Sequence, residues 1–212
     1  MKYKLLLSII TLLALTFSAG IFGQKSNSSI KKIYLQGGIG AASRNGVSGE
    51  VGLQAIINNK WLASVSYQNI EANPKNLPSD YEGEIFIFFP IDLTPTVNTN
   101  VFNITAGKYF ATGKRTWITT EGGICFGTGE TMSFKRTDPV FYIFGETANY
   151  VYETEKKNLV GGVLKADFNW AFASFMGLGM NVYANFNSVQ SPVGFQLKLM
   201  LGKMGVAKKH KS

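Results

Sequence analysis

The chain has 212 residues, of which 45% are hydrophobic and 16% are charged, well below the usual charged share of about 25%. Its net charge of +8 comes from the two ends, because residues 33–202 hold 12 Lys and Arg against 13 Asp and Glu, and a near-neutral body argues against a nucleic-acid surface. The length suits one domain, and the single cysteine, Cys125, excludes a disulfide framework.

The N-terminus has the pattern of a secretory signal peptide. MKYK supplies two lysines, LLLSIITLLAL is uncharged, and small residues follow. We expect residues 1–23 to be removed on export and residues 24–32 to form a basic stub. An uncleaved membrane anchor is the alternative, because residues 5–24 carry no charge and about 20 residues suffice to span a bilayer.

The body of the chain alternates apolar and polar residues, as β-strands do. MGLGMNVYANF, for example, places apolar residues at every second position. The pattern predicts eight strands, at residues 33–42, 48–57, 61–70, 101–110, 116–127, 159–170, 176–186 and 193–203.

Short and longer connections alternate between these strands. The longest ones cover residues 71–100 and 130–158. Transmembrane barrels show this asymmetry, with an even number of strands of about 10 residues. We therefore predict an all-β fold, an eight-stranded antiparallel up-and-down transmembrane β-barrel over residues 33–203, followed by a basic tail at 204–212.

The apolar side of each strand is predicted to face lipid and the polar side to fill the lumen. Trp61 and Trp170 flank short turns, as an interfacial aromatic girdle would, and Lys108 should reach the interface from the lipid side. A soluble secreted β-sandwich would also alternate, but it would not explain the loop lengths. The predicted polar network of the lumen contains Glu50, Gln54, Glu121, Lys165, Asp167, Asn181, Tyr183 and Lys198.

Catalytic and metal-binding patterns are scarce. The single histidine, His210, lies in the basic tail, which argues against Ser–His–Asp and Cys–His catalysis and against a zinc site, and no cofactor is predicted. Glu50 and Glu121 could do acid–base work, but ion pairing with Lys165 and Lys198 is the stronger interpretation. Cys125 is expected to be inert.

The two long loops are the best candidates for function, because binding residues concentrate on loops held by rigid scaffolds. Both contain β-prone aromatic stretches, which either extend the barrel strands or offer an edge to a partner strand. An extracellular protein or glycan is the predicted partner, alongside outer-membrane lipid. The candidate binding residues are Phe86, Phe88, Phe141, Tyr142 and Tyr150.

The segments GGIGAAS, SYQNIEA, NITAGKYF, GLGMNVYANFN and GFQLKLMLGK together resemble the small outer-membrane β-barrel proteins of Bacteroidota-type bacteria. The resemblance implies a barrel in the bacterial outer membrane and says little about activity. The leading hypothesis is a non-enzymatic barrel with a filled polar lumen and a structural or surface-binding role. The alternatives are an outer-membrane lipid-modifying enzyme and a soluble secreted ligand carrier.

Overall fold

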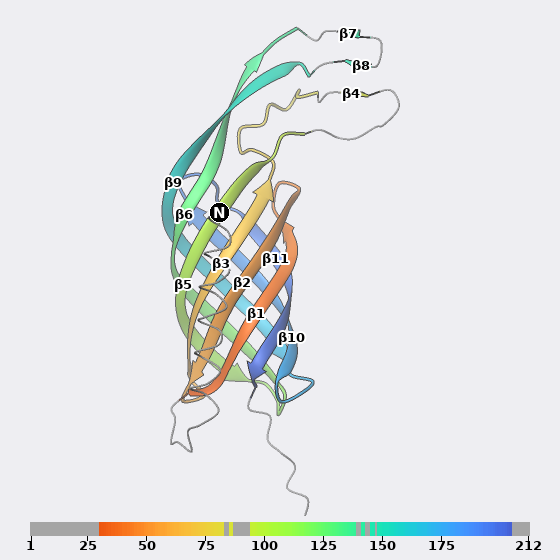
Figure 1. Cartoon of the computed structure of the whole chain (residues 1–212). Helices are drawn as coiled ribbons and strands as arrows, with labels where there is room; N and C mark the ends of the chain where they lie inside the picture. The colour runs from red at the N-terminus through yellow and green to blue at the C-terminus, as the bar shows by residue number, and fades with distance from the viewer. Residues whose placement is uncertain are drawn as a thin grey trace, which may run out of the picture.

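The computed structural model describes residues 30–82, 85–86, 94–138, 141–142, 145–146 and 148–204. Eight strands form a closed antiparallel barrel in the order β1-β11-β10-β9-β6-β5-β3-β2, and hydrogen bonds between β1 and β11 complete the ring (Figure 1). This confirms the predicted eight-stranded up-and-down barrel and rules out a β-sandwich. No helix in the described ranges is long and apolar enough to span a membrane.

The barrel strands match the eight predicted segments, and several are longer. They are β1 (Ile30–Ala42), β2 (Gly46–Ile57), β3 (Trp61–Ala72), β5 (Val97–Ala111), β6 (Thr116–Arg136), β9 (Tyr150–Trp170), β10 (Met176–Asn187) and β11 (Val193–Lys203). The remaining strands, β4 (Ile85–Phe86), β7 (Phe141–Tyr142) and β8 (Gly145–Glu146), form a separate small sheet in the order β4-β8-β7.

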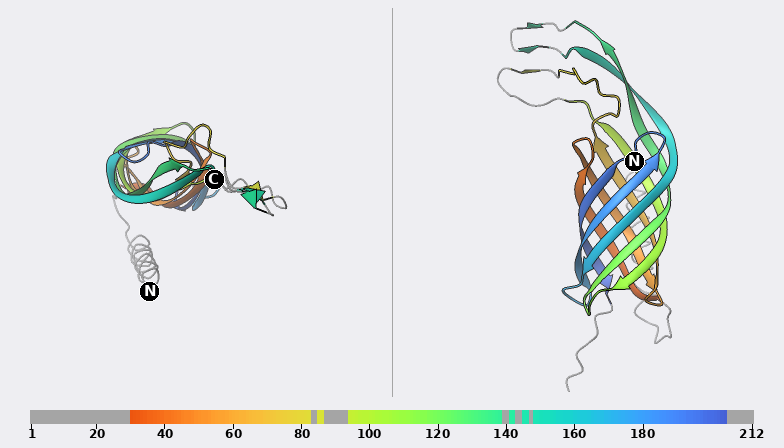
Figure 2. Two further views of the ribbon diagram at one scale, coloured as in Figure 1. Left: turned by 90° about the horizontal axis from the view of Figure 1, so that it is seen from above. Right: turned by 180° about the vertical axis from the view of Figure 1, so that it is seen from behind.

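The β2–β3, β5–β6 and β9–β10 connections lie at one end, which we call the short-turn end (Figures 1 and 2). The opposite end, which we call the long-loop end, bears the long β3–β5 and β6–β9 connections together with the β1–β2 and β10–β11 connections. These last two have only three and five residues, so the predicted alternation of short and longer connections is not strict.

The turn between β2 and β3 shows why the connections at the short-turn end are tight. Asn58 and Asn59 both have positive φ, 53° and 54°, as a type I′ hairpin turn requires, and asparagine tolerates this conformation. The Lys60 N–H donates to the Ile57 carbonyl at 3.1 Å and closes the hairpin.

Much of the long connection at 130–158 is strand, which confirms the interpretation that this stretch extends the barrel strands. β6 and β9 have 21 residues each and remain paired up to Arg136 and Tyr150. They form a two-stranded hairpin that rises beyond the barrel (Figure 2). Apart from the buried Met132, its residues are exposed or half-exposed on both faces, so the alternation that marks a half-buried strand is missing there. The β3–β5 connection behaves differently, since its β4 pairs with β8 from the other long connection.

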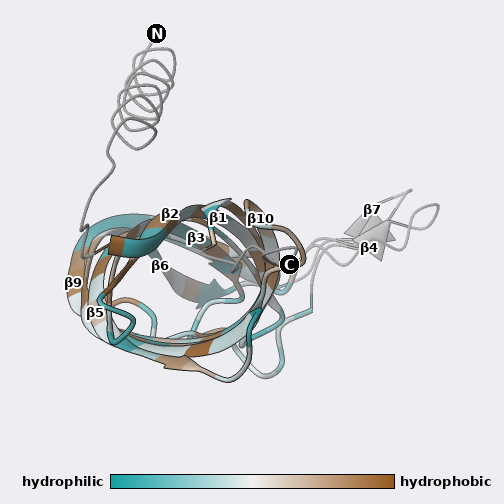
Figure 3. Ribbon diagram, turned by 90° about the horizontal axis from the view of Figure 1, so that it is seen from below, coloured by the Kyte–Doolittle hydropathy of each residue, from teal (hydrophilic) through white to brown (hydrophobic). Residues whose placement is uncertain are grey.

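Polarity is arranged as the alternation predicted. Polar residues such as Gln54, Glu121 and Asn181 are buried inside, while residues such as Ile39, Ile124 and Leu197 are more than half exposed on the outside. Figure 3 shows hydrophilic and hydrophobic positions alternating along the barrel strands. The core of the molecule is thus the packed lumen.

The predicted boundaries of the barrel shift slightly. β1 begins at Ile30 rather than at residue 33, so part of the predicted stub belongs to the barrel, and Lys32 is buried there. Met204, the first residue of the predicted tail, is also buried. The predicted signal peptide and the rest of the tail lie outside the described residues.

Candidate functional site

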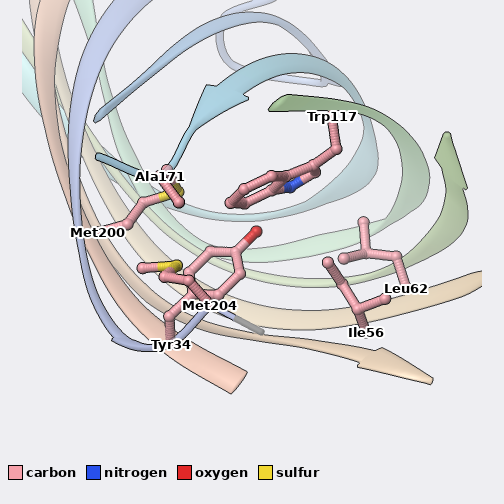
Figure 4. Close-up of a cluster of buried hydrophobic side chains, with 7 residues drawn as sticks. All are labelled: Tyr34, Ile56, Leu62, Trp117, Ala171, Met200 and Met204. Atoms are coloured by element: carbon pink, nitrogen blue, oxygen red, sulfur yellow. The ribbon is translucent and has the colours of Figure 1, made fainter. Parts of the chain in front are cut away.

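An apolar plug fills the short-turn end of the lumen. The indole ring of Trp117 packs near the ring of Tyr34, with 6.2 Å between the ring centroids, and the Lys32 ammonium lies 3.9 Å from the Trp117 ring centroid. A cation over an indole face is favourable when both are shielded from water. Figure 4 shows the plug, which consists of Tyr34, Ile56, Leu62, Trp117, Ala171, Met200 and Met204.

Above the plug, one ion pair crosses the lumen. Lys165 on β9 lies 2.5 Å from the Glu50 carboxylate on β2, and these strands stand four places apart in the ring of eight. The Lys165 ammonium also donates to the Ser66 hydroxyl at 3.1 Å. The pair therefore ties opposite walls together, which neighbouring-strand hydrogen bonds cannot do.

A second ion pair joins Lys198 on β11 to Asp167 on β9 at 2.5 Å. The Asp167 carboxylate also accepts hydrogen bonds from the Thr119 hydroxyl at 2.8 Å and from the Asn181 amide at 2.7 Å. Lys198 donates to the Gln36 side chain at 3.0 Å. A buried charge is tolerated only when it is paired and hydrogen-bonded in this way.

Glu121 departs from the predicted pairing. Its carboxylate accepts hydrogen bonds from the Ser64 hydroxyl at 2.7 Å, from Thr105 and from the Gln54 amide at 3.4 Å. The prediction that Glu50 and Glu121 both pair with lysine is therefore right for Glu50 and wrong for Glu121. The reason is geometric: Lys165 reaches across to Glu50, and Lys198 is already paired with Asp167.

Two glycines make room for the Lys198 side chain. A Cβ atom at Gly38 would lie 3.0 Å from the Cγ atom of Lys198, and one at Gly179 would lie 3.5 Å from its Cε atom. Gly38 comes from the GGIGAAS stretch. Its role is close packing inside the barrel rather than nucleotide binding.

Apolar side chains also fill the lumen toward the long-loop end. One cluster contains Val101, Cys125, Leu159 and Val189, and another contains Ala42, Ile70 and Tyr183. Tyr183, which was predicted to belong to the polar network, is buried in the lumen, and its ring packs with apolar neighbours. The lumen therefore has a polar middle with apolar packing at both ends.

The exterior becomes polar toward the long-loop end. Asn69, Asn100, Thr128 and Asn158 are directly paired neighbours on β3, β5, β6 and β9, and they form one row across the outer surface. The Asn100 side-chain oxygen accepts hydrogen bonds from the Tyr67 hydroxyl at 2.7 Å and from the Asn69 amide at 2.9 Å. This polar row marks where these strands leave the apolar zone.

The segment that follows β3 contacts both strands of the projecting hairpin, near Arg136 on β6 and Tyr150 on β9. Asp80 forms an ion pair with Arg136 at 3.6 Å and accepts a hydrogen bond from the Tyr150 hydroxyl at 2.9 Å. That hydrogen bond, together with weaker contributions from desolvation and the Asp80 charge, raises the pKa of Tyr150 above its ordinary value. The rings of Tyr81, Phe134 and Tyr150 pack together beside it.

The β9 side of the hairpin is open. β9 pairs with β10 only from Gly161 onward, so over residues 150–160 no strand within the described ranges lies on that edge. Val151 and Tyr152 are about half exposed there. Of the five predicted binding residues, Tyr150 is part of the aromatic packing, Phe86 lies in β4, and Phe141 and Tyr142 form β7. Phe88 lies outside the described residues.

Small-molecule and metal chemistry find little support in the part of the chain that the structure describes. A pocket at the long-loop mouth, lined by residues such as Asn76 and Glu130, has a volume of about 30 Å³, far below the roughly 300–1,000 Å³ of ligand sites. No group of three or more His, Cys, Asp or Glu there is arranged to hold a metal ion. Glu50 and Glu121 are buried in the lumen, away from the outer surface.

Sequence reasoning missed the apolar lumen residues. Ile56, Leu62 and Trp117 are apolar residues in the otherwise polar, inward-facing rows of their strands, at positions near the short turns. The alternation itself was the available signal, because each of them lies an even number of residues from an inward-facing polar residue of the same strand.

Comparison with known proteins yields similarity of general shape. Ail, the attachment invasion locus protein of Yersinia pestis, matches with a TM-score of 0.46 at 9% identity over 83% of this chain and 98% of its own. A de novo designed transmembrane β-barrel matches with a TM-score of 0.45 at 9% identity over 81% of this chain and 96% of its own. No protein-family model and no curated protein matches the sequence. Similarity this distant transfers no activity or ligand to the chain.

Proposed function

We propose that the chain is a non-enzymatic outer-membrane β-barrel, closed to solutes, whose long-loop end binds a partner at the cell surface. The observation that carries this proposal is the reversed distribution of polarity: charged side chains are buried inside, and large apolar side chains cover the outside. In water such an exterior would far exceed the few hundred Å² of apolar patch that monomeric proteins expose. In lipid it is the required surface, and closure leaves no unpaired strand edge within the barrel.

Two features support the orientation and the depth. The aromatic residues Trp61 and Trp170 are about half exposed at the short-turn end, where an interfacial girdle is expected. The polar row from Asn69 to Asn158 bounds the apolar zone on the other side. Export through residues 1–23 belongs to the same proposal.

Heat-modifiable gel mobility of the outer-membrane fraction tests this placement. A closed barrel that resists detergent runs faster unboiled than boiled. We expect such a shift for the protein extracted from the outer membrane. Recovery in the soluble fraction with no shift would contradict the proposal.

The packed lumen supports a barrel that does not conduct. Eight-stranded barrels have interiors just wide enough for side chains to fill, and here the Trp117 plug and the two buried ion pairs occupy that space. In planar bilayers we expect no steady single-channel conductance. Reproducible conductance steps of the unmodified protein would contradict a closed lumen.

The projecting hairpin supports a surface-binding role. Beyond the last β5 pairing at Gly129, β6 continues for the seven residues 130–136, which corresponds to about 23 Å at roughly 3.3 Å per residue. The free β9 edge over residues 150–160 would accept a partner by strand addition, and Phe86, Phe88, Phe141 and Tyr142 would supply aromatic contacts. The partner class is an extracellular protein or glycan.

A hairpin deletion tests the binding role. Residues 132–154 are replaced by Asn-Gly, which joins the cross-strand partners Thr131 and Glu155 through a type I′ turn. Cells that display this variant or the intact protein are compared for adhesion to immobilised extracellular proteins and glycans. We expect the variant to keep its heat-modifiable barrel and to lose adhesion. Equal adhesion of both would contradict a role for the hairpin.

A further inference from the structure

Acidic residues are distributed unevenly between the two ends of the barrel. The sequence has no Asp or Glu before Glu50 or after Asp167, and none between Glu50 and Glu71 or between Asp92 and Glu121. These stretches contain every short turn and every strand end at the short-turn end. Glu50, Glu121 and Asp167 are themselves buried in the lumen. The described acidic side chains outside the lumen therefore belong to the long-loop side.

Within the described ranges, every charged side chain at the short-turn end is basic. Lys32 is buried against Trp117, and the others are exposed. None of them forms an ion pair within the part of the chain that the structure describes. We call the exposed set the basic rim; it consists of Lys31, Lys60, Lys108, Lys114, Arg115 and Lys203.

Two members of the basic rim stand on the outer surface of the barrel wall. Lys108 continues the outward row that includes Phe102 and Ile104 on β5, and Lys203 continues the row of Leu199 and Leu201 on β11. Each apolar row thus reaches a cation near the short-turn end. If the apolar rows contact acyl chains, these two cations lie at the depth of the lipid phosphate groups.

The Trp61–Lys108 pair strengthens this assignment. The two residues are cross-strand partners, and the Lys108 ammonium lies 3.3 Å from the Trp61 ring centroid. Indole rings favour the headgroup level of a bilayer. Arg115 lies in the neighbouring short turn, where its guanidinium donates one hydrogen bond, at 3.4 Å, to the Phe172 carbonyl. Its other donors suit the fork geometry of phosphate recognition.

We propose that the basic rim binds the phosphate groups of anionic phospholipids in the leaflet that surrounds the short-turn end. This inference rests on the proposed insertion of the barrel in a membrane and adds the lipid class. The lipid, rather than free phosphate, is the source because Lys108 and Lys203 lie on the outer wall beside apolar residues. Free phosphate in water would gain nothing from the apolar residues beside these two cations.

Lipid selection by the reconstituted full-length protein tests the proposal. The protein is inserted in vesicles of phosphatidylcholine with one fifth phosphatidylglycerol and extracted in mild detergent, and the copurifying lipids are quantified. We expect phosphatidylglycerol to be enriched by about fivefold or more, the factor that one surface lysine contributes near an anionic membrane. The variant K108Q/R115Q/K203Q should lose most of this enrichment. The matched control K75Q/K135Q/K156Q removes the same charge at the long-loop end and should retain it.

The outcomes separate the two proposals. A barrel that shows heat-modifiable mobility in these vesicles but no enrichment, or equal enrichment in both triple variants, overturns the basic rim while leaving membrane insertion intact. A protein that fails to insert in either lipid overturns the proposed function itself. Inorganic phosphate is added in a parallel sample. Loss of the enrichment at moderate phosphate, but not at equal ionic strength of chloride, would show a free-anion site and overturn the lipid assignment.

Discussion

Two ion pairs of similar length lie in very different surroundings. Glu50 and Lys165 in the lumen are 2.5 Å apart, and their side chains are 2% and 1% exposed. Glu155 and Lys157 on the hairpin are 2.9 Å apart, with side chains 71% and 47% exposed. Water screens the second pair, and it contributes little to stability. The first pair has been taken out of water, so each partner depends on the other. An ion pair therefore contributes to the stability of the barrel in the lumen and contributes little on the hairpin.

The largest expected effect comes from removing one partner of the buried pair. Lys165→Met leaves the Glu50 carboxylate buried without its cation, which should lower the free energy of unfolding by about 3–5 kcal/mol. Lys157→Met on the hairpin should change it by less than about 1 kcal/mol. Urea unfolding in vesicles, followed by tryptophan fluorescence, measures both.

The double variant Glu50→Leu/Lys165→Met sharpens this prediction. Replacing a buried pair by apolar groups of similar size is often nearly neutral, so we expect most of the lost stability to return. Equal losses in the single and double variants would mean that packing, rather than an uncompensated charge, governs this site.

The Trp117 plug gives the next effect. Trp117→Ala removes a fully buried indole and should cost about 3 kcal/mol or more, because the surrounding side chains cannot close the gap. It also opens the short-turn end, so brief conductance steps are expected in planar bilayers. The outward-facing Trp170→Ala serves as the control and should not conduct. A silent Trp117→Ala barrel would place the seal elsewhere in the lumen.

Glycines on the two faces of the wall give a third contrast. A Cβ atom at Gly123 would collide with the Ile104 carbonyl on the neighbouring strand, whereas one at Gly37 meets nothing within 4 Å. Gly123→Ala should therefore cost about 1–3 kcal/mol, the usual range for overpacking. Gly37→Ala should be close to neutral. Similar unfolding midpoints for the two variants would contradict the close approach of the strands at Gly123.

The contrast between lumen and hairpin also explains what the sequence could reveal. All eight strands and their inward polar residues were predictable because one face is apolar and the other polar, so the period of two is strong. Residues 130–136 and 150–158 are strand as well, but apart from Met132 they are exposed or half-exposed on both faces, so the period of two disappears. The pairing of Lys198 with Asp167, two strands away, depends on the closure and stagger of the barrel, which alternation alone does not fix.

The smallest expected effect is confined to the hairpin. Tyr150→Phe removes the hydroxyl that donates to Asp80. The barrel should keep its unfolding midpoint, because few contacts couple the hairpin to the lumen, while trypsin should cut faster at the neighbouring Arg136. The raised pKa of Tyr150 means that this contact is intact below the ordinary tyrosine pKa of 10.0 and is lost as the pH rises through the raised value. Cleavage of the unmodified protein should therefore approach that of Tyr150→Phe only in strongly alkaline solution. Cleavage rates that already coincide at neutral pH would show that Asp80 and Arg136 hold this end of the paired strands without the tyrosine.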